Sequence, residues 1–474
     1  MTRFPIRLSL TLLFAVLLVF PARAQPATSA SELKQKLYAA VRGRPGLEEA
    51  DVGIYIKVVK TGRVLYNQNG NQPMIPASNM KLVTTAVALD LLGEDYRFET
   101  RVIGPQPDAQ GVIPGDLILR GSGDPTFCYP YNQPCTEPLS FFVRELKKLG
   151  VKAVAGDVIA DDSAFDREFL GRGWFDRYLL DSYAAPVGAL SLNANLVQLN
   201  ISNKGVTTDP STTSLSFNSK LRPGGGSVWV DRKRGEDRIT VEGDAGGGVQ
   251  RSLTIYNPTR FTGGAFLKML EKGGIDVRGK LKLLPEGERP PLSGLTVFAQ
   301  FRSPPLIKLV RQTNRESDNL FAQHIFKAAG RQLTGYGTAE SGEAAVKQFL
   351  EQRGLDARGL KMYDGSGLSE LDRISPRQLV DVLCAMWEHP LGQEYIDSLP
   401  AGGEGTLRYR LNGLVVRAKT GTLKGHSGLS GYVVSSYGQT IAFSVLVNHV
   451  EGTWNAIELE DHVVKVLATW PDPL

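Results

Sequence analysis

A serine and a lysine stand three residues apart at the start of an expected helix, in Ser78-Asn79-Met80-Lys81. Residues at this spacing share one helix face, with Cβ atoms roughly 5–6 Å apart, so the hydroxyl and the amine can meet. A serine hydroxyl becomes a good nucleophile when a neighbouring base takes its proton, and a lysine whose pKa is lowered by burial and nearby cations can be that base. The pair therefore predicts a serine nucleophile with a lysine general base, beside helix N–H groups that could stabilise an oxyanion.

Two further polar motifs follow along the chain. Ser317-Asp318-Asn319 begins a second expected helix, and Lys419-Thr420-Gly421-Thr422 lies between an apolar strand and the expected strand 428–435. Each motif is short, and matching triplets or quartets without this context stand at 31–34, 60–62, 191–193 and 216–218. The order of the three motifs and their places beside helices and strands therefore carry the prediction, rather than any one motif alone.

Motifs for metal and cofactor chemistry are missing from the sequence. There is no Gly-x-x-x-x-Gly-Lys-Ser/Thr loop, no His-Glu-x-x-His, no Cys-x-x-Cys and no Gly-x-Ser-x-Gly. The five histidines, at 324, 389, 426, 449 and 462, have no metal-ligand spacing. We therefore expect no metal and no cofactor, and neither a zinc enzyme nor a Ser-His-Asp enzyme.

The elements that would position the motifs lie at the two ends of the chain. Alternating apolar residues over 52–58 predict a strand, and an apolar helical stripe runs from 82 to Gly93. Near the other end, strand candidates at 428–435 and 440–448 precede a closing helix at 455–468. One sheet built from both ends would bring the termini together, as is common in domains.

The length of 474 residues exceeds one ordinary core and predicts two or three domains. From about residue 98 the pattern changes to short strands separated by Gly- and Pro-containing turns, and 196–258 has almost no helical periodicity. Because 235 residues separate Lys81 from Ser317, we interpret this strand-rich middle as an insertion into a domain formed by the two ends.

The first 24 residues have the pattern of an export signal. Arg3 and Arg7 precede the apolar run 8–20, and Ala22-Arg23-Ala24 offers small residues for cleavage after Ala24. The run is too short to span a bilayer comfortably, and a short membrane anchor is the alternative interpretation. No later stretch is long and apolar enough to span, so we expect a soluble periplasmic protein after cleavage.

Composition and charge exclude several classes of protein. Hydrophobic residues make up 42% of the chain and charged residues 22%, which fits a folded, turn-rich protein and not a disordered one. The formal charge of +5 falls to +2 when the three leader arginines are removed. With so small a net charge, we expect no stripe of basic residues that could neutralise many phosphates, and therefore no nucleic-acid partner.

The three cysteines suit an exported protein. Cys128 and Cys135 lie in one Pro/Tyr/Asn-rich loop, and a disulfide between them is a hypothesis. Cys384 sits among apolar residues of a helical pattern, where a free cysteine usually acts as a small core residue.

In this order and context, the three motifs resemble those of the penicillin-recognising serine enzymes: Ser-x-x-Lys, Ser-x-Asn and Lys-Thr-Gly. With the long gap after the first motif, the chain resembles the low-molecular-mass, class C penicillin-binding proteins, the D-alanyl-D-alanine carboxypeptidase/endopeptidase family. The similarity covers nearly the whole mature chain, and further stretches that carry it lie at 121–126, 156–158, 317–320, 364–369 and 418–423.

The resemblance implies an α/β multidomain protein. Its penicillin-recognising, serine transpeptidase-like α/β catalytic domain would have an antiparallel sheet flanked by helices and would carry two inserted, β-rich domains. Beyond the signal peptide 1–24, the expected division is 25–97 and 295–474 for the catalytic domain, 98–190 and 259–294 for inserted domain II, and 191–258 for inserted domain III.

The resemblance also implies a serine peptidase that acts on peptidoglycan stem peptides and cross-links. Ser78 would attack the penultimate D-Ala carbonyl, Lys81 would be its general base, and Ser317 would relay a proton to the leaving amine. Backbone N–H groups of Ser78 and Thr422 would form the oxyanion hole. The residues expected to bind substrate are Asn319, Lys419, Thr420, Gly421, Thr422 and Asp161, the last of them through the diamino acid side chain of the stem.

Two other functions remain open at the level of sequence. A serine β-lactamase shares the motifs and the acylation chemistry, although the large insertion after Lys81 favours the peptidase. A noncatalytic peptidoglycan-binding scaffold could keep the fold and lose the chemistry, although each catalytic position is present. In every catalytic case, β-lactam inhibitors are expected to bind covalently at Ser78.

Overall fold

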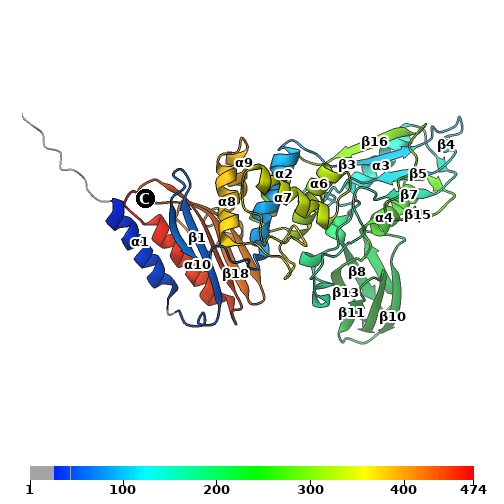
Figure 1. Ribbon diagram of the computed structural model, residues 1–474. Coiled ribbons are helices and arrows are strands. Elements are labelled where there is room, and N and C mark those ends of the chain that lie inside the picture. The colour runs from blue at the N-terminus through cyan, green and yellow to red at the C-terminus, as the bar shows by residue number, and fades with distance from the viewer. Residues whose placement is uncertain (1–25, 43) are drawn as a thin grey trace, which may run out of the picture.

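The computed structural model describes residues 26–42 and 44–474. The expected signal peptide, 1–24, lies outside the described residues. The chain forms an elongated molecule in which both ends fold together at one tip and the middle of the sequence forms the other (Figure 1). We call the part formed by the two ends the terminal domain. Among the helices in the described part of the chain, none has both the length and the apolar character needed to cross a bilayer.

A five-stranded sheet is the centre of the terminal domain. Its order is β17-β18-β19-β1-β2, and every neighbouring pair is antiparallel. The alternation predicted over 52–58 is confirmed, since Val52, Ile54 and Ile56 share one buried cluster and Tyr55 belongs to the cluster on the opposite face. The strands are β1 (Asp51–Val58), β2 (Val64–Gln68), β17 (Val416–Leu423), β18 (His426–Val434) and β19 (Thr440–Asn448).

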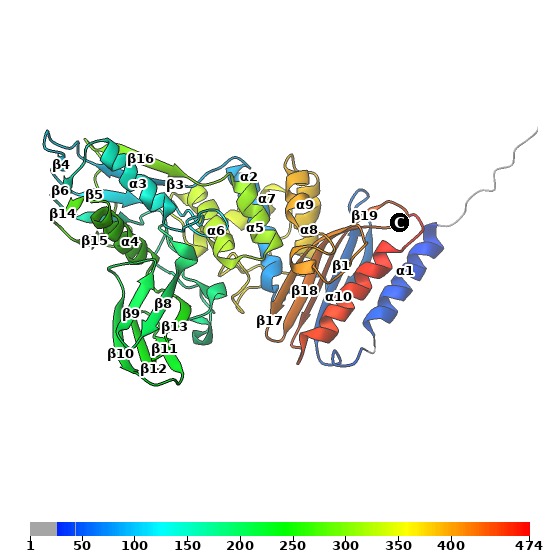
Figure 2. The ribbon, with the colours of Figure 1, turned by 180° about the vertical axis from the view of Figure 1, so that it is seen from behind.

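Helices cover both faces of this sheet, as expected for the fold class. α1 (Pro26–Val41) and α10 (Thr453–Ala468) lie side by side on the outer face, as both views show (Figures 1 and 2). α8 (Pro376–Trp387) covers the other face, and α2 (Met80–Leu92) lies behind it. Every residue of α2 from Met80 to Leu89 is buried, because this helix is surrounded by others. The remaining helices of this layer are α5 (Leu306–Arg315), α6 (Asn319–Thr334), α7 (Ala339–Gln352), α9 (Gly392–Ser398) and the short η5 (Gly405–Leu407).

Inserted domain II combines a mixed sheet with two helices. The sheet has the order β15-β7-β5-β3-β16, with parallel pairs around β7 and antiparallel pairs around β3. Its elements, with those of a small adjoining sheet, are β3 (Glu99–Gly104), β4 (Val112–Ile113), β5 (Leu117–Arg120), α3 (Glu137–Lys148), β6 (Ala153–Val154), β7 (Val158–Asp161), α4 (Pro258–Lys272), β14 (Asp276–Val277), β15 (Leu281–Leu283) and β16 (Thr296–Arg302).

Two expectations about domain II differ from this structure. β16 pairs with β3 from Thr296 opposite Gly104 to Arg302 opposite Glu99, so the insertion continues to about residue 302, whereas the sequence placed everything from 295 in the catalytic domain. The domain is also α/β rather than simply β-rich, because α3 and α4 pack on its sheet.

Inserted domain III consists of strands that lie between 196 and 254. They form two three-stranded sheets with the orders β13-β8-β9 and β10-β12-β11. Their inner faces join the apolar cluster of domain II, so the two inserted domains share one core. The strands are β8 (Leu196–Ser202), β9 (Gly205–Asp209), β10 (Ser216–Arg222), β11 (Val228–Arg232), β12 (Arg238–Asp244) and β13 (Val249–Thr254), and the single turns η2 (Asp176–Tyr178), η3 (Ser182–Ala184) and η4 (Asn193–Asn195) precede them.

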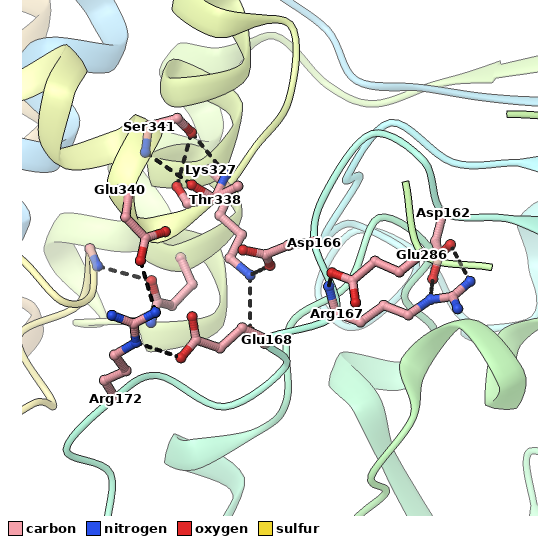
Figure 3. Close-up of polar contacts among 12 residues, drawn as sticks. Asp162, Asp166, Arg167, Glu168, Arg172, Glu286, Lys327, Thr338, Glu340 and Ser341 are labelled. Atoms are coloured by element: carbon pink, nitrogen blue, oxygen red, sulfur yellow. Dashed lines mark hydrogen bonds and ion pairs between the residues drawn. The ribbon is translucent and has the colours of Figure 1, made fainter. Parts of the chain in front are cut away.

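A network of ion pairs joins the insertion to α6 and α7 (Figure 3). The Lys327 amine of α6 donates to Asp166 Oδ1 at 2.6 Å and to the Glu168 carbonyl at 3.0 Å. Arg172 contacts both Glu168, at 3.0 Å, and Glu340 of α7, at 2.9 Å. One carboxylate oxygen from each of Asp166, Glu168 and Glu340 lies within 4.8 Å of the other two. Because each has a lysine or arginine partner, the cluster is a salt-bridge network that fastens the insertion.

The disulfide hypothesis is wrong for this structure, in which Cys128, Cys135 and Cys384 are all free. Cys128 is buried in the terminal-domain cluster, with its Sγ donating to the Pro125 carbonyl at 3.1 Å. Cys135 packs instead against the core of the inserted domains. The two thiols therefore belong to different cores. Cys384 is partly buried beside the terminal-domain core, as its helical pattern indicated.

Candidate active site

Ser78 lies on a single 3-10 turn, η1 (Ala77–Asn79), immediately before α2. Ala77 has φ 47°, a left-handed conformation that residues other than glycine rarely adopt. Such strain persists where the surroundings impose it, and it is frequent at functional sites. Ser78 is half-buried and lines a cavity of about 650 Å³ between the terminal domain and the insertion.

Lys81 lies behind Ser78 with its amine surrounded by three oxygens. Its Nζ is 2.8 Å from Ser78 Oγ, 2.6 Å from Asn319 Oδ1 and 2.7 Å from the Ser366 carbonyl. The side chain is 0% exposed. The predicted contact between Ser78 and Lys81 is therefore present, and two further acceptors fix the amine in place.

The burial of Lys81 favours its neutral form. Burial lowers the pKa of Lys81 to about 7, although the carboxylates of Asp364 and Asp318 act in the opposite direction. A buried ammonium loses its hydration, and this loss outweighs the attraction to the two acids. At neutral pH a substantial share of Lys81 is unprotonated and can accept a proton from Ser78.

Ser317 and Lys419 form a second serine–lysine pair across the cavity. Lys419 Nζ donates to Ser317 Oγ at 2.9 Å and to the Thr420 carbonyl at 2.9 Å. Ser317 has φ 58°, a second strained position at the site. Burial, reinforced by the nearby charge of Lys81, holds the pKa of Lys419 well below its usual range. An incoming carboxylate would reverse this and favour the charged lysine.

The Lys-Thr-Gly motif lies inside β17, which is an edge strand of the sheet. A Cβ on Gly421 would lie 2.7 Å from the Pro76 carbonyl oxygen and 3.0 Å from Ser78 N. Glycine at this position therefore lets the strand backbone approach the turn that carries Ser78. Thr422 follows and is exposed at the cavity. The sequence placed the motif after a strand at 414–416, whereas β17 begins at Val416 and contains it.

Asn319 connects the catalytic side of the cavity to the insertion. Its Oδ1 accepts from Lys81, and its Nδ2 donates to the Tyr183 carbonyl at 2.7 Å. Asp318, the N-cap of α6, accepts from Phe321 N at 3.1 Å and fixes the start of this helix. Tyr183 and Tyr178, from the insertion, line the cavity opposite Thr422 and Leu423 of β17. No motif marks these tyrosines, and the sequence analysis missed them.

A buried loop presents the Ser366 carbonyl to Lys81. Asp364 Oδ1 accepts from Ser366 N at 2.8 Å, and Asp364 Oδ2 accepts from Ser369 N at 2.8 Å and from Trp174 Nε1 at 2.6 Å. Gly367 has φ 79°, and a Cβ there would lie 1.8 Å from the Ala77 carbonyl. The stretch 364–369 carries part of the family resemblance, but its residue types and spacing do not indicate that a backbone oxygen holds the lysine.

The structure brings Ser78, Lys81, Ser317, Asn319 and Lys419 together, with Thr420, Gly421 and Thr422 on the adjoining strand, but it places Asp161 elsewhere. Asp161 ends β7 and is 2% exposed. Its Oδ2 is 3.3 Å from Arg120 Nε, and its Oδ1 accepts from Ser163 N. Asp161 is therefore buried, ion-paired with Arg120 and not among the residues that line the active-site cavity.

The Ser78–Lys81 pair, set between a helical layer and the edge of an antiparallel sheet, places the chain among the penicillin-recognising serine hydrolases. Comparison with known proteins narrows this class. The D-Ala-D-Ala carboxypeptidase 3 (S13) family matches residues 33–470. The chain therefore belongs to that family, and it is a serine-type D-Ala-D-Ala carboxypeptidase that acts on peptidoglycan.

Individual relatives agree with this assignment. The D-alanyl-D-alanine carboxypeptidase of Actinomadura sp. (strain R39) is 32% identical over 452 residues, covering 89% of this chain and 82% of the relative. The D-alanyl-D-alanine carboxypeptidase DacB of Haemophilus influenzae is 26% identical over 424 residues, covering 85% and 86%. The crystal structure of penicillin binding protein 4 (dacB) from Haemophilus influenzae has the same fold, with a TM-score of 0.76, 24% identity, and coverage of 93% of this chain and 99% of that one.

Proposed function

We propose that Ser78 is the nucleophile of this carboxypeptidase and that Lys81 is its general base. The observation that carries the proposal is the environment of the Lys81 amine, with its lowered pKa and three oxygen neighbours, one of which is Ser78 Oγ. Lys81 takes the hydroxyl proton as Ser78 Oγ attacks the carbonyl carbon of the penultimate D-Ala. The resulting oxyanion lies beside the N–H groups of Ser78 and Thr422, which we assign as the oxyanion hole.

Ser317 relays the proton that Lys81 has accepted to the nitrogen of the leaving D-Ala as the peptide bond breaks, so Lys81 is neutral again when the ester is hydrolysed. The 2.9 Å contact between Lys419 Nζ and Ser317 Oγ holds the Ser317 hydroxyl in place for this relay. The terminal carboxylate of the substrate binds at Lys419, with the hydroxyls of Thr420 and Thr422, and its charge restores the protonated lysine. Asn319 holds Lys81 and the substrate amide, and Gly421 permits close approach of β17. Water then hydrolyses the ester of Ser78 and releases the shortened stem peptide.

The same chemistry accounts for two further proposed activities. A cross-link differs from a free stem in the group attached to the leaving nitrogen, so the exposed cavity admits endopeptidase cleavage of D-alanyl-diaminopimelate bonds. A β-lactam ring acylates Ser78 in the same way, but its leaving nitrogen stays tethered to the ester. The solved structure of the Haemophilus influenzae penicillin binding protein 4 with a β-lactam supports this part of the proposal.

The decisive experiment uses purified mature protein with uncross-linked and cross-linked muropeptides. Mass analysis should find loss of the terminal D-Ala, and cleaved cross-links, with wild type but not with Ser78→Ala. Labelled penicillin should form an adduct on Ser78. Turnover of penicillin faster than of muropeptides would instead favour a β-lactamase, and absence of both products and adduct would favour a noncatalytic scaffold.

We also propose that the enzyme acts in the periplasm after cleavage of the leader following Ala24. The charged start, the apolar run and the small residues Ala22 and Ala24 support this. N-terminal sequencing of protein purified from its native host should begin at Gln25. An N-terminus before Ala22 would contradict cleavage at this site.

A further inference from the structure

A second cavity lies at the other end of α6 from the active site. It has a volume of about 340 Å³, and its lining includes Tyr96, Arg97, Glu99, Arg101, Arg120 and Arg331. Arg331 comes twelve residues after Asn319 on α6, so roughly 18 Å of helix separates this cavity from the catalytic residues. We call it the arginine cavity.

The charges of the arginine cavity do not balance. Four guanidinium groups line it, against the lining carboxylate of Glu99 and the buried carboxylate of Asp161 behind it. Asp161 pairs with Arg120, at 3.3 Å. Glu99 pairs with Arg101 and also with Arg302, which lies outside the cavity lining. Both carboxylates are therefore already engaged.

The other two arginines have no acidic partner among the described residues. Arg97 Nη1 donates to the Ser303 carbonyl at 2.8 Å, and the side chain of Arg331 makes neither a hydrogen bond nor an ion pair. Arg331 is half-buried at the junction between the terminal domain and the insertion. Burial, together with the charges of Arg120 and Arg289, lowers the pKa of Arg331, against the opposing effects of Tyr96 and Asp161. A cation held this way costs stability unless a counter-charge approaches it.

We propose that the arginine cavity binds a small oxyanion that carries at least two negative charges, held by Arg331, Arg97 and Arg120. The planar fork of a guanidinium matches the paired oxygens of a phosphate or a carboxylate, and this geometry is shared by both ligand sources. Arg331 belongs to α6, Arg97 lies just before β3, and Arg120 ends β5. The bound anion therefore joins the catalytic helix layer to inserted domain II.

Thermal denaturation of the mature protein tests this site. A ligand that binds the native state raises the melting temperature with its concentration. Inorganic pyrophosphate and citrate are titrated separately, with sodium chloride added to hold the ionic strength constant, so that the two arms distinguish phosphate from carboxylate ligands. We expect the melting temperature of the wild type to rise to a plateau in at least one of the two titrations. Arg331→Gln should abolish the rise, yet be no less stable than wild type without ligand, because the substitution removes an uncompensated charge.

Two further variants complete the test. Arg97→Gln should weaken the response at least tenfold in ligand concentration, and Arg251→Gln, an exposed arginine of β13 outside the cavity, should respond as wild type does. Labelled penicillin should acylate Arg331→Gln at the wild-type rate, which reports an intact catalytic site. A rise of equal size in wild type and Arg331→Gln, or no rise in either arm, would overturn the proposal.

Discussion

The reactivity of Ser78 depends on how the hydrogens of the Lys81 amine are distributed. A neutral amine has two N–H donors and one lone pair. The Asn319 Oδ1 and the Ser366 carbonyl can only accept, so they take the two donors. The lone pair then remains for the hydroxyl of Ser78, at 2.8 Å. The two fixed acceptors therefore orient the base as well as hold it.

The first prediction concerns the pH dependence of acylation. Lys81 must lose its proton to act, and its pKa is lowered to about 7. The acylation rate with labelled penicillin should therefore fall about tenfold per pH unit well below this value and reach a plateau above it. Rates measured by quenched labelling give the profile, and Ser78→Ala provides the blank. A flat profile across this range would remove Lys81 as the titrating base.

The second prediction concerns the glycine of the edge strand. In Gly421→Ala the new Cβ meets the Pro76 carbonyl oxygen at 2.7 Å and Ser78 N at 3.0 Å, so β17 must move away from the nucleophile. Displacements of about 1 Å can cost about 10²-fold in rate, and we expect a loss of that order in penicillin acylation. Gly247→Ala is the matched control, because a Cβ there finds no atom within 4 Å. Equal rates for the two variants would show that this close approach is not required.

At the scale of elements, α6 is held at its start and at its middle. Asp318 caps its start beside the active site, and Lys327, two turns later, is fastened to the insertion by Asp166. The Lys327 and Asp166 side chains are 6% and 11% exposed, so neither charge is well hydrated. Burial raises the pKa of Asp166, and the charge of Lys327 opposes this. Removal of either side chain would therefore leave the charge of the other buried without a partner.

The third prediction follows from this pair. Lys327→Met should lower the free energy of unfolding by about 3–5 kcal/mol, because the carboxylate of Asp166 stays buried without its partner. The double variant Asp166→Asn/Lys327→Met should recover part of the loss. Denaturant unfolding followed by fluorescence measures both. If the double variant is as unstable as the sum of the two single variants, the two residues are not coupled.

Elements with strong local patterns could be predicted from the sequence, and those defined by distant partners could not. The strand predicted at 440–448 has the same bounds as β19. Its apolar residues alternate between two buried faces, which is a local pattern that the sequence displays. β16 has a similar local pattern, but only its pairing with β3 assigns it to domain II. Asp161 matched a family motif, yet its burial against Arg120 comes from tertiary packing that one sequence does not display.

At the scale of the whole molecule, the insertion contributes to the catalytic cavity rather than standing apart from it. Tyr178 and Tyr183 line that cavity, and the Tyr183 carbonyl accepts from Asn319. The segment that carries them is fastened in turn to domain III, where Arg232 Nη2 donates to the Leu179 carbonyl at 2.8 Å. The three motifs could be predicted from the sequence because each is a short local pattern. The tyrosine side of the cavity could not be predicted, because its position depends on contacts among three domains.

The last prediction tests this connection. Arg232 is 3% exposed, and its guanidinium also donates to the Thr254 carbonyl and hydroxyl, so it holds the 176–184 segment against β13. In Arg232→Gln the Leu179 carbonyl keeps the Thr254 hydroxyl as a donor but loses the guanidinium. The segment is then held less firmly, and so is the Tyr183 carbonyl that fixes Asn319, which positions Lys81. We expect penicillin acylation to slow several-fold, although Arg232 touches no catalytic residue, and cleavage of cross-linked muropeptides to slow with it. Arg251→Gln in the same domain should retain the wild-type rate. If Arg232→Gln acylates at the wild-type rate while its melting temperature falls, domain III stabilises the insertion without acting on the active site.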